Sequence, residues 1–372
     1  MAYIYTSGIN DKRRHDDKPN GGRSLVLLLL DFLMLLIMAV LIFSTLTVVI
    51  CQYVSPESSG VLSVMSLGAP IIYLLDILVM LYWVVRWRWF HVLAMAIMVV
   101  LGLFYLSRYY NIEFDRQYVT SYNERAYTKI MTYNVHEGRN EGFVDYISNH
   151  NPDIICVQEM TIGCDNWNKL TKTYKTTYKP NVAKGGNQIL SKFDIIDSGG
   201  VGELPRRTAT WADLKIGKDT VRVVSLHLQS TSIRPEDTNF IEGHGYINDD
   251  NRETKLRSIV GRLVENNKKR AVQAEMVADF LAKAPYKKIV CGDFNDVPLS
   301  YTYSTIASDL NDTFAEAAVG FAYTFNIRYR LLRIDNILVS PAIEVSSYEV
   351  DNNVDLSDHF PVISRMKINT ED

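Results

Sequence analysis

The stretch KIVCGDFN, residues 288–295, carries the pattern that decides the fold of the C-terminal part of the chain. The β-prone run Lys288–Cys291 is followed by Gly292 and then by Asp293 and Asn295, on either side of Phe294. Such a segment is expected to form a buried strand whose end alone presents polar chemistry. Because residues i and i+2 of an extended segment point the same way, Asp293 and Asn295 can converge on one substrate group.

Five further segments have the same design, an apolar run that ends in an acid, an amide or a histidine. They are Tyr133-Asn134-Val135, Val157-Gln158-Glu159, Leu226-His227-Leu228, Arg333-Ile334-Asp335 and Ser357-Asp358-His359. Strands that feed one polar site are expected to show this pattern. Oxygen ligands combined with two imidazoles suit a hard cation such as Mg²⁺ and a phosphate substrate.

In this order and at this spacing, the six segments resemble those of the endonuclease/exonuclease/phosphatase superfamily. That DNase I-like group contains nucleases, abasic-site nucleases, inositol-phosphate phosphatases and neutral sphingomyelinases. The resemblance covers about residues 125–370. Strands mixed with helices already favour an α/β domain. The resemblance implies a four-layer α/β/β/α sandwich with the site at one edge of its two sheets, and a hydrolase of ester bonds dependent on Mg²⁺ or Mn²⁺.

Three residues are candidate metal ligands. Glu159 follows a buried strand, where an uncompensated charge would be costly. Asn134 offers an amide oxygen for a metal or a phosphate, as similar positions in the family do, and the resemblance puts Asp358 on the metal side. The alternatives are a surface salt bridge for Glu159 and a turn-forming role for Asn134.

The remaining segments supply candidate catalytic groups. By resemblance, Asp293 aligns or deprotonates the attacking water, Asn295 contacts the phosphate, and Asp335 orients His359. A histidine beside a phosphate can act as a base or as a charged contact, so the group that takes the proton of the water stays open. His227 resembles a phosphate or leaving-group contact, and its alternative is a structural role.

Two weaker candidates are assigned to substrate binding. Asn187 matches a family segment near the phosphate, although a tight turn explains the glycines before it equally well. His136 occupies the position, two residues after the first asparagine, where many nucleases of the family carry an acid. This departure leaves a second metal or phosphate contact in doubt and points to a different substrate class.

The N-terminal part of the chain has three apolar runs, Ser24–Val49, Val61–Val85 and Trp89–Ser107. Each has about the length that crosses a bilayer core of roughly 30 Å. The sequence therefore predicts a tail over residues 1–23, a membrane anchor of three transmembrane helices over 24–107, a linker over 108–125 and a catalytic domain over 126–372. Asp31 and Asp76 lie within the runs, where an acid is a functional candidate. The alternative, which we favour, is a hydrogen bond between helices.

Basic residues predict the orientation of this anchor. Five of them precede the first run, the loop Gln52–Gly60 has none, and Arg86 and Arg88 occupy the second turn. By the positive-inside rule the tail is cytoplasmic, and the catalytic domain of this integral membrane protein is extracytoplasmic.

The composition leaves two substrate classes open. The formal charge is −3 and the pI about 6.2, so no excess of positive charge indicates nucleic-acid binding. Together with the anchor, this favours a lipid-headgroup phosphodiesterase slightly over an extracytoplasmic nuclease on DNA or RNA. The segment Thr231–Arg270 is either a basic flap or a solvated helix face. An inactive membrane-bound binding module would need missing catalytic residues, and no protein partner is predicted.

Overall fold

The computed structural model of this protein describes residues 25–105, 108–111, 127–178, 186–231, 237, 249–326 and 331–368. The predicted cytoplasmic tail, with its basic residues, and residues 112–125 of the predicted linker lie outside the described residues.

Two six-stranded sheets form the centre of the C-terminal domain. The strands of the first sheet, in spatial order, are β13 (Glu344–Val350), β14 (Val362–Lys367), β2 (Thr128–Glu137), β3 (Ile154–Met160), β5 (Gly186–Ser191) and β4 (Lys175–Thr176). Those of the second are β10 (Asn311–Asp312), β12 (Asp335–Val339), β9 (Lys287–Asp293), β8 (Asp219–His227), β7 (Ala209–Ile216) and β6 (Asp194–Gly200). Each sheet has one parallel pair, β2 with β3 and β8 with β9.

The sheets pack face to face over one apolar layer. Alternate residues of their strands fill it, including Ile130, Ile154, Cys156, Val223, Ile289 and Ile337. The alternating pattern of the strands puts their other side chains on the outer faces.

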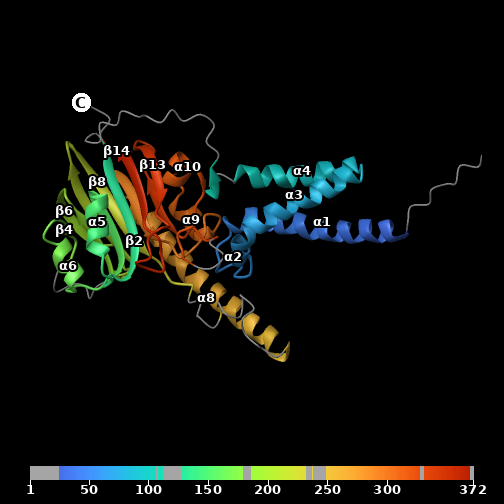
Figure 1. Ribbon diagram of the computed structural model, residues 1–372, viewed down its shortest axis with the longest axis horizontal. Coiled ribbons are helices and arrows are strands. Elements are labelled where there is room, and N and C mark those ends of the chain that lie inside the picture. The colour runs from blue at the N-terminus through green and yellow to red at the C-terminus, as the bar shows by residue number, and fades with distance from the viewer. Residues whose placement is uncertain are drawn as a thin grey trace, which may run out of the picture.

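Helices cover both outer faces. Helices α5 (Phe143–His150) and α6 (Asp165–Leu170) lie on the first sheet, and α8 (Asp249–Ala282) and α9 (Tyr301–Ile306) on the second. Short α10 (Thr313–Ala317) lies near β12 and β13. The predicted four-layer α/β/β/α sandwich is therefore confirmed (Figure 1).

An apolar bundle of helices α1 (Leu25–Cys51), α3 (Ala69–Val85) and α4 (Trp89–Phe104) projects from one side of the sandwich (Figure 1). The short elements α2 (Leu62–Met65) and η1 (Ser66–Gly68) precede α3. The prediction of three transmembrane helices needs correction. Among the described residues, two segments, Leu25–Cys51 and Leu62–Val85, are long and apolar enough to span a membrane, whereas α4 has only 16 residues. At 1.5 Å per residue α4 is about 24 Å long, short of a bilayer core of about 30 Å.

Both acids of the bundle contact neighbouring helices, as expected. Asp31 accepts hydrogen bonds from Arg86 at 2.7 and 2.8 Å and from Tyr82 at 2.6 Å. Asp76 accepts one from Thr45 at 2.6 Å. Asp31 is near the start of α1 and Arg86 follows α3, so α1 and α3 run in opposite directions.

The other end of the bundle packs on the sandwich. Val48, Ala69 and Tyr109 form one apolar cluster with Leu299 of the catalytic domain. The first residues of the predicted linker also contact the sandwich. Tyr109 belongs to this cluster, and β1 (Tyr110–Asn111) pairs with β11 (Gly320–Phe321). Residues 108–111 are thus structurally part of the C-terminal domain.

Candidate active site

One row of neighbouring residues crosses three strands of the second sheet. Asp293, the last residue of β9, is paired with His227 at the end of β8 and with Asp335 at the start of β12. Directly paired residues of adjacent strands project to the same face of a sheet. Three of the predicted catalytic residues are therefore brought together by strand register.

The first sheet contributes Asn134 and Glu159 from its parallel pair β2 and β3. Asn134 Nδ2 lies 3.2 Å from Glu159 Oε1 and 3.2 Å from Asp293 Oδ2. The amide of Asn134 thus joins the two sheets at the predicted site.

Asp293 is almost fully buried and is held from several directions. Oδ1 accepts a hydrogen bond from the Asn295 backbone at 2.8 Å, and Oδ2 accepts one from Asn295 Nδ2 at 3.0 Å. Nε2 of His227 and Nε2 of His359 lie 3.8 and 3.7 Å from Oδ2. Two amides fix this carboxylate, and two imidazoles flank it.

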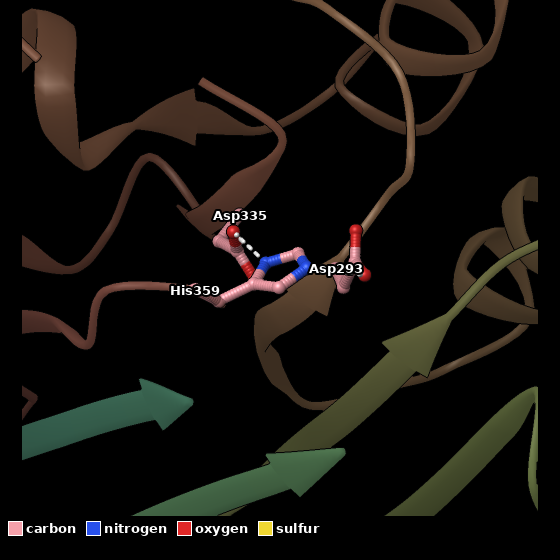
Figure 2. A group of neighbouring side chains, drawn as sticks. All are labelled: Asp293, Asp335 and His359. Carbon is pink, nitrogen blue, oxygen red and sulfur yellow. Dashed lines mark hydrogen bonds and ion pairs between the residues drawn. The ribbon is translucent and has the colours of Figure 1, made fainter. Parts of the chain in front are cut away.

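Asp335 and His359 form a buried pair beside Asp293. His359 Nδ1 lies 2.8 Å from Asp335 Oδ2. Figure 2 shows the ring between the carboxyl groups of Asp335 and Asp293. The Thr324 hydroxyl accepts the backbone N–H of Asp335 at 3.0 Å and so fixes the start of β12. Sequence reasoning missed Thr324, because it lies in an irregular segment with no motif.

The charge state of His359 follows from these neighbours. Burial disfavours the imidazolium and lowers the pKa of His359, but the carboxylates of Asp335 and Asp293 outweigh it and raise the pKa to about 10. The ring is therefore protonated at neutral pH. With Nδ1 donating to Asp335, Nε2 is a donor that can contact a phosphate oxygen.

Backbone strain is concentrated at the site. Glu159, Asn295 and His136 have φ angles of 59°, 52° and 41°, in the left-handed region that non-glycine residues seldom adopt. Such strain persists only where the surrounding structure enforces it, and it is frequent at functional sites.

Gly292 of the Gly-Asp-Phe-Asn motif has a steric explanation. Its φ is +135°, and a Cβ built there would lie 2.1 Å from the carbonyl oxygen of Leu226 on β8. A side chain would push β9 away from β8 and separate Asp293 from His227.

The rim of the site is formed by His136 and Asp358, both exposed. His136 Nδ1 lies 3.7 Å from Glu159 Oε2 and 3.8 Å from Asp358 Oδ1. His227 Nε2 approaches Glu159 Oε1 at 3.4 Å. These contacts connect every predicted site residue except Asn187.

Asn187 is buried between the sheets. Its Nδ2 donates to the carbonyl of Ser225 at 2.6 Å and to that of Thr208 at 3.4 Å, and its Oδ1 accepts the Ser225 hydroxyl. This placement favours a role in joining β5 to β8, and substrate contact by Asn187 stays a prediction.

A pocket of about 440 Å³ adjoins Glu159 and His227. Gly186, Arg207, Gln229 and Gln273 line it, among others. Within the described part of the chain Arg207 has no salt-bridge partner, so its charge is available to an anionic group. Arg207 was not predicted from the sequence. The adjacent arginines Arg206 and Arg207, just before β7, could have indicated a contact with an anionic group.

The acidic groups fit a hard divalent cation. Over the described residues, every ion pair of Glu159, Asp293 and Asp358 is with a histidine. Three carboxylates without a lysine or arginine partner leave negative charge that a cation would neutralise. Carboxylate and amide oxygens are the ligand types that Mg²⁺ and Mn²⁺ prefer.

Comparison with known proteins agrees with this geometry. The model of the endonuclease/exonuclease/phosphatase family matches residues 131–359, more than half of the chain. The chain belongs to this family. It is therefore a hydrolase that acts on phosphoesters. A second model, described as a domain of unknown function (DUF8431), matches residues 31–109, the apolar bundle.

Several solved structures are similar in fold. An endonuclease/exonuclease/phosphatase family protein from Bacteroides thetaiotaomicron is 18% identical, with 66% of this chain and 96% of that chain covered and a TM-score of 0.45. A 3′ phosphatase from Neisseria bound to product DNA hairpin is 20% identical, with 64% and 98% covered and a TM-score of 0.47. A mannosyl-6-phosphatase from B. thetaiotaomicron is 19% identical, with 64% and 99% covered and a TM-score of 0.44. The search of curated proteins gave no match.

Proposed function

We propose that this family member is a membrane-anchored phosphodiesterase that hydrolyses phosphodiesters of lipid headgroups by in-line attack of water. The proposed hydrolysis by water rests on one observation. The buried Asp293 carboxylate is fixed by Asn134 and Asn295 and flanked by His227 and His359.

Asp293 is the group that accepts the proton of the water. Asp335 and Asp293 favour the imidazolium form of His359, so we assign His359 as a donor to the phosphate and Asp293 as the base. A water on Asp293 attacks phosphorus as its proton passes to the carboxylate, and the bond to the leaving oxygen breaks. His227 faces Asp293 and Glu159 and contacts the phosphate or the leaving oxygen.

Glu159, Asn134 and Asp358 would hold Mg²⁺ or Mn²⁺. When bound, the cation would neutralise charge that develops on the phosphate and the leaving oxygen. His136, between Glu159 and Asp358, would contact the substrate at the rim.

The membrane assignment is supported by the surface of the bundle. Its outward side chains are large and apolar, and Phe43, Phe90 and Phe104 are at least 70% exposed. A continuous exposed apolar surface marks contact with a partner or a lipid phase. The start of α1 and the turn Arg86–Arg88 lie at the end far from the sandwich (Figure 1). This arrangement puts the start of α1 and the catalytic domain at opposite ends of the bundle and supports a cytoplasmic N-terminus and an extracytoplasmic catalytic domain. The topology requires α4, shorter than the two candidate spans, to complete a third crossing.

The lipid substrate is supported by the distance between site and bundle. Leu299 contacts the bundle at Cys51, the last residue of a candidate span. Leu299 is the fourth residue after Asn295, so the two are at most about 14 Å apart. The site is thereby held near headgroup level, where membrane phosphodiesters are met at high effective concentration.

A substrate panel tests this proposal. The full-length protein with Mg²⁺ or Mn²⁺ is assayed on vesicles of phospholipid or sphingomyelin, on DNA and RNA, and on inositol phosphates. We expect headgroup release from vesicles to exceed nucleic-acid cleavage. Degradation of DNA with a steep salt dependence and no action on vesicles would identify a nuclease instead.

The orientation is tested separately. A reporter fused after Asp372 should be active outside the cytoplasm, and a reporter that is active only in the cytoplasm would refute the proposed topology.

A further inference from the structure

The segment that follows Asp293 is unusually enclosed. Residues 291–300 are all buried, although residues 294–300 contain neither helix nor strand. Loops normally run over the protein surface, because their backbone groups need partners. Residues 293–300 are here called the catalytic loop. Because this loop is buried, the helices and side chains packed against it determine its conformation.

The apolar bundle covers one end of the catalytic loop. Leu299 is fully buried in the cluster with Val48, Ala69 and Tyr109. Cys51 Sγ, at the end of α1, lies 3.6 Å from the carbonyl oxygen of Leu299, and its single S–H also faces the carbonyl of Val48 at 3.1 Å.

A second contact lies one residue earlier. Arg108, which follows α4, donates from Nη1 to the carbonyl of Pro298 at 3.1 Å and to Gln52 Oε1 at 3.2 Å. Arg108 thus joins the Pro298 carbonyl of the loop to Gln52, the residue that directly follows α1. Buried carbonyl groups without donors are costly, so these contacts define where the loop lies.

The middle of the loop is held by α8. Buried Asp296 lies 3.5 Å from Arg270 Nε of α8, and Arg270 Nη1 donates to the carbonyl of Gln229 at 2.6 Å. Asn295, the residue before Asp296, makes two of the hydrogen bonds that fix the Asp293 carboxylate, and Asn134 makes a third. A continuous chain of contacts therefore runs from the bundle to the proposed base.

We propose that Leu299 is a positioning residue for hydrolysis: its burial against the apolar bundle sets the catalytic loop and, through Asn295, the orientation of Asp293. The bundle is then a working part of the catalytic unit and not a tether alone. This inference rests on the proposed role of Asp293. A small displacement of a catalytic group lowers turnover strongly and leaves substrate binding nearly unchanged.

The test measures kcat and KM on bis(p-nitrophenyl) phosphate, a small soluble phosphodiester, with the full-length protein in detergent and Mg²⁺. Leu299→Ala should lower kcat by about tenfold or more and change KM by less than about twofold. Leu299→Met, which conserves volume, should restore most of kcat. The matched control is Leu41→Ala, because Leu41 is also a buried leucine but lies within the middle of the bundle.

Two outcomes overturn the inference: wild-type kcat in Leu299→Ala, or an equal loss of kcat in Leu41→Ala. If Leu299→Ala does not fold, Leu299→Val carries the same comparison. Hydrogen exchange of residues 291–300 provides a readout that needs no substrate. Should wild-type protein hydrolyse no phosphodiester, the proposed function fails, and faster exchange in Leu299→Ala than in Leu41→Ala still decides whether the bundle sets the loop.

Discussion

His359, which precedes β14 of the first sheet, donates from Nδ1 at 2.8 Å to Oδ2 of Asp335 at the start of β12 of the second sheet, and both side chains are buried. This pair fixes the direction of the imidazole and keeps it charged. The ring is held between Asp335 and Asp293, and its Nε2 lies 3.7 Å from Asp293 Oδ2.

Asp335→Asn should lower kcat on a soluble phosphodiester by about 10²–10⁴-fold, because the ring loses the charge that orients and protonates it. Asp197→Asn, an exposed carboxylate on β6 of the same sheet, serves as the control and should retain full activity. An Asp335→Asn enzyme within a few-fold of wild type would remove the pair from the mechanism.

The charge of His359 also predicts a pH dependence of stability in protein freed of metal. Its pKa is raised to about 10 in the folded state, against an ordinary value of about 6.5. The stability it contributes is therefore fully present below about pH 6.5 and is lost as the pH rises through about 10. The difference in Tm between wild type and His359→Gln should shrink over this interval. A difference that is constant from pH 6 to 10 would contradict the assignment.

Chelation should abolish hydrolysis, and Mg²⁺ or Mn²⁺ should restore it. Glu159→Ala should raise the metal concentration for half-maximal activity by about 10–100-fold, because a hard ligand is lost. Exposed Glu203, replaced by alanine, is the control. Full activity in excess EDTA would exclude the metal.

Arg207→Gln should lower kcat/KM by about 10–100-fold, mainly through KM, since a charge-assisted hydrogen bond to an anionic substrate group is lost. Arg206→Gln is the matched control, because Arg206 does not line the pocket. Equal effects of both substitutions would indicate a general electrostatic attraction.

Gly292→Ala should reduce the free energy of unfolding by roughly 3 kcal/mol or more, because the added Cβ overlaps the Leu226 carbonyl. Gly261→Ala, on an exposed face of α8 with open space around it, should instead stabilise by about 0.5–1 kcal/mol. Thermal unfolding of both variants measures this contrast, and a Gly292→Ala protein as stable as wild type would refute the steric argument.

The short motifs could be interpreted from the sequence as strands with polar ends, because each motif is a local pattern. The run Lys288–Cys291 and the polar residues after it predict a buried strand with a chemical end, and the structure has β9 there. The α/β/β/α sandwich followed from resemblance to a family that the family model then confirmed. Apolar runs likewise predicted helices, but the third run, Trp89–Ser107, is longer than the helix it forms, which ends at Phe104.

What the sequence by itself determined was the type of each element and the kinds of side chain at the strand ends, since periodicity and composition are local properties. Tertiary structure alone decided the row His227–Asp293–Asp335, because register depends on how strands from distant parts of the chain pair. It also placed Asn187 between the sheets and Leu299 against Cys51, 248 residues away. Such contacts depend on packing between layers, and the local pattern of residues around Leu299 carries no signal of the helix that covers it.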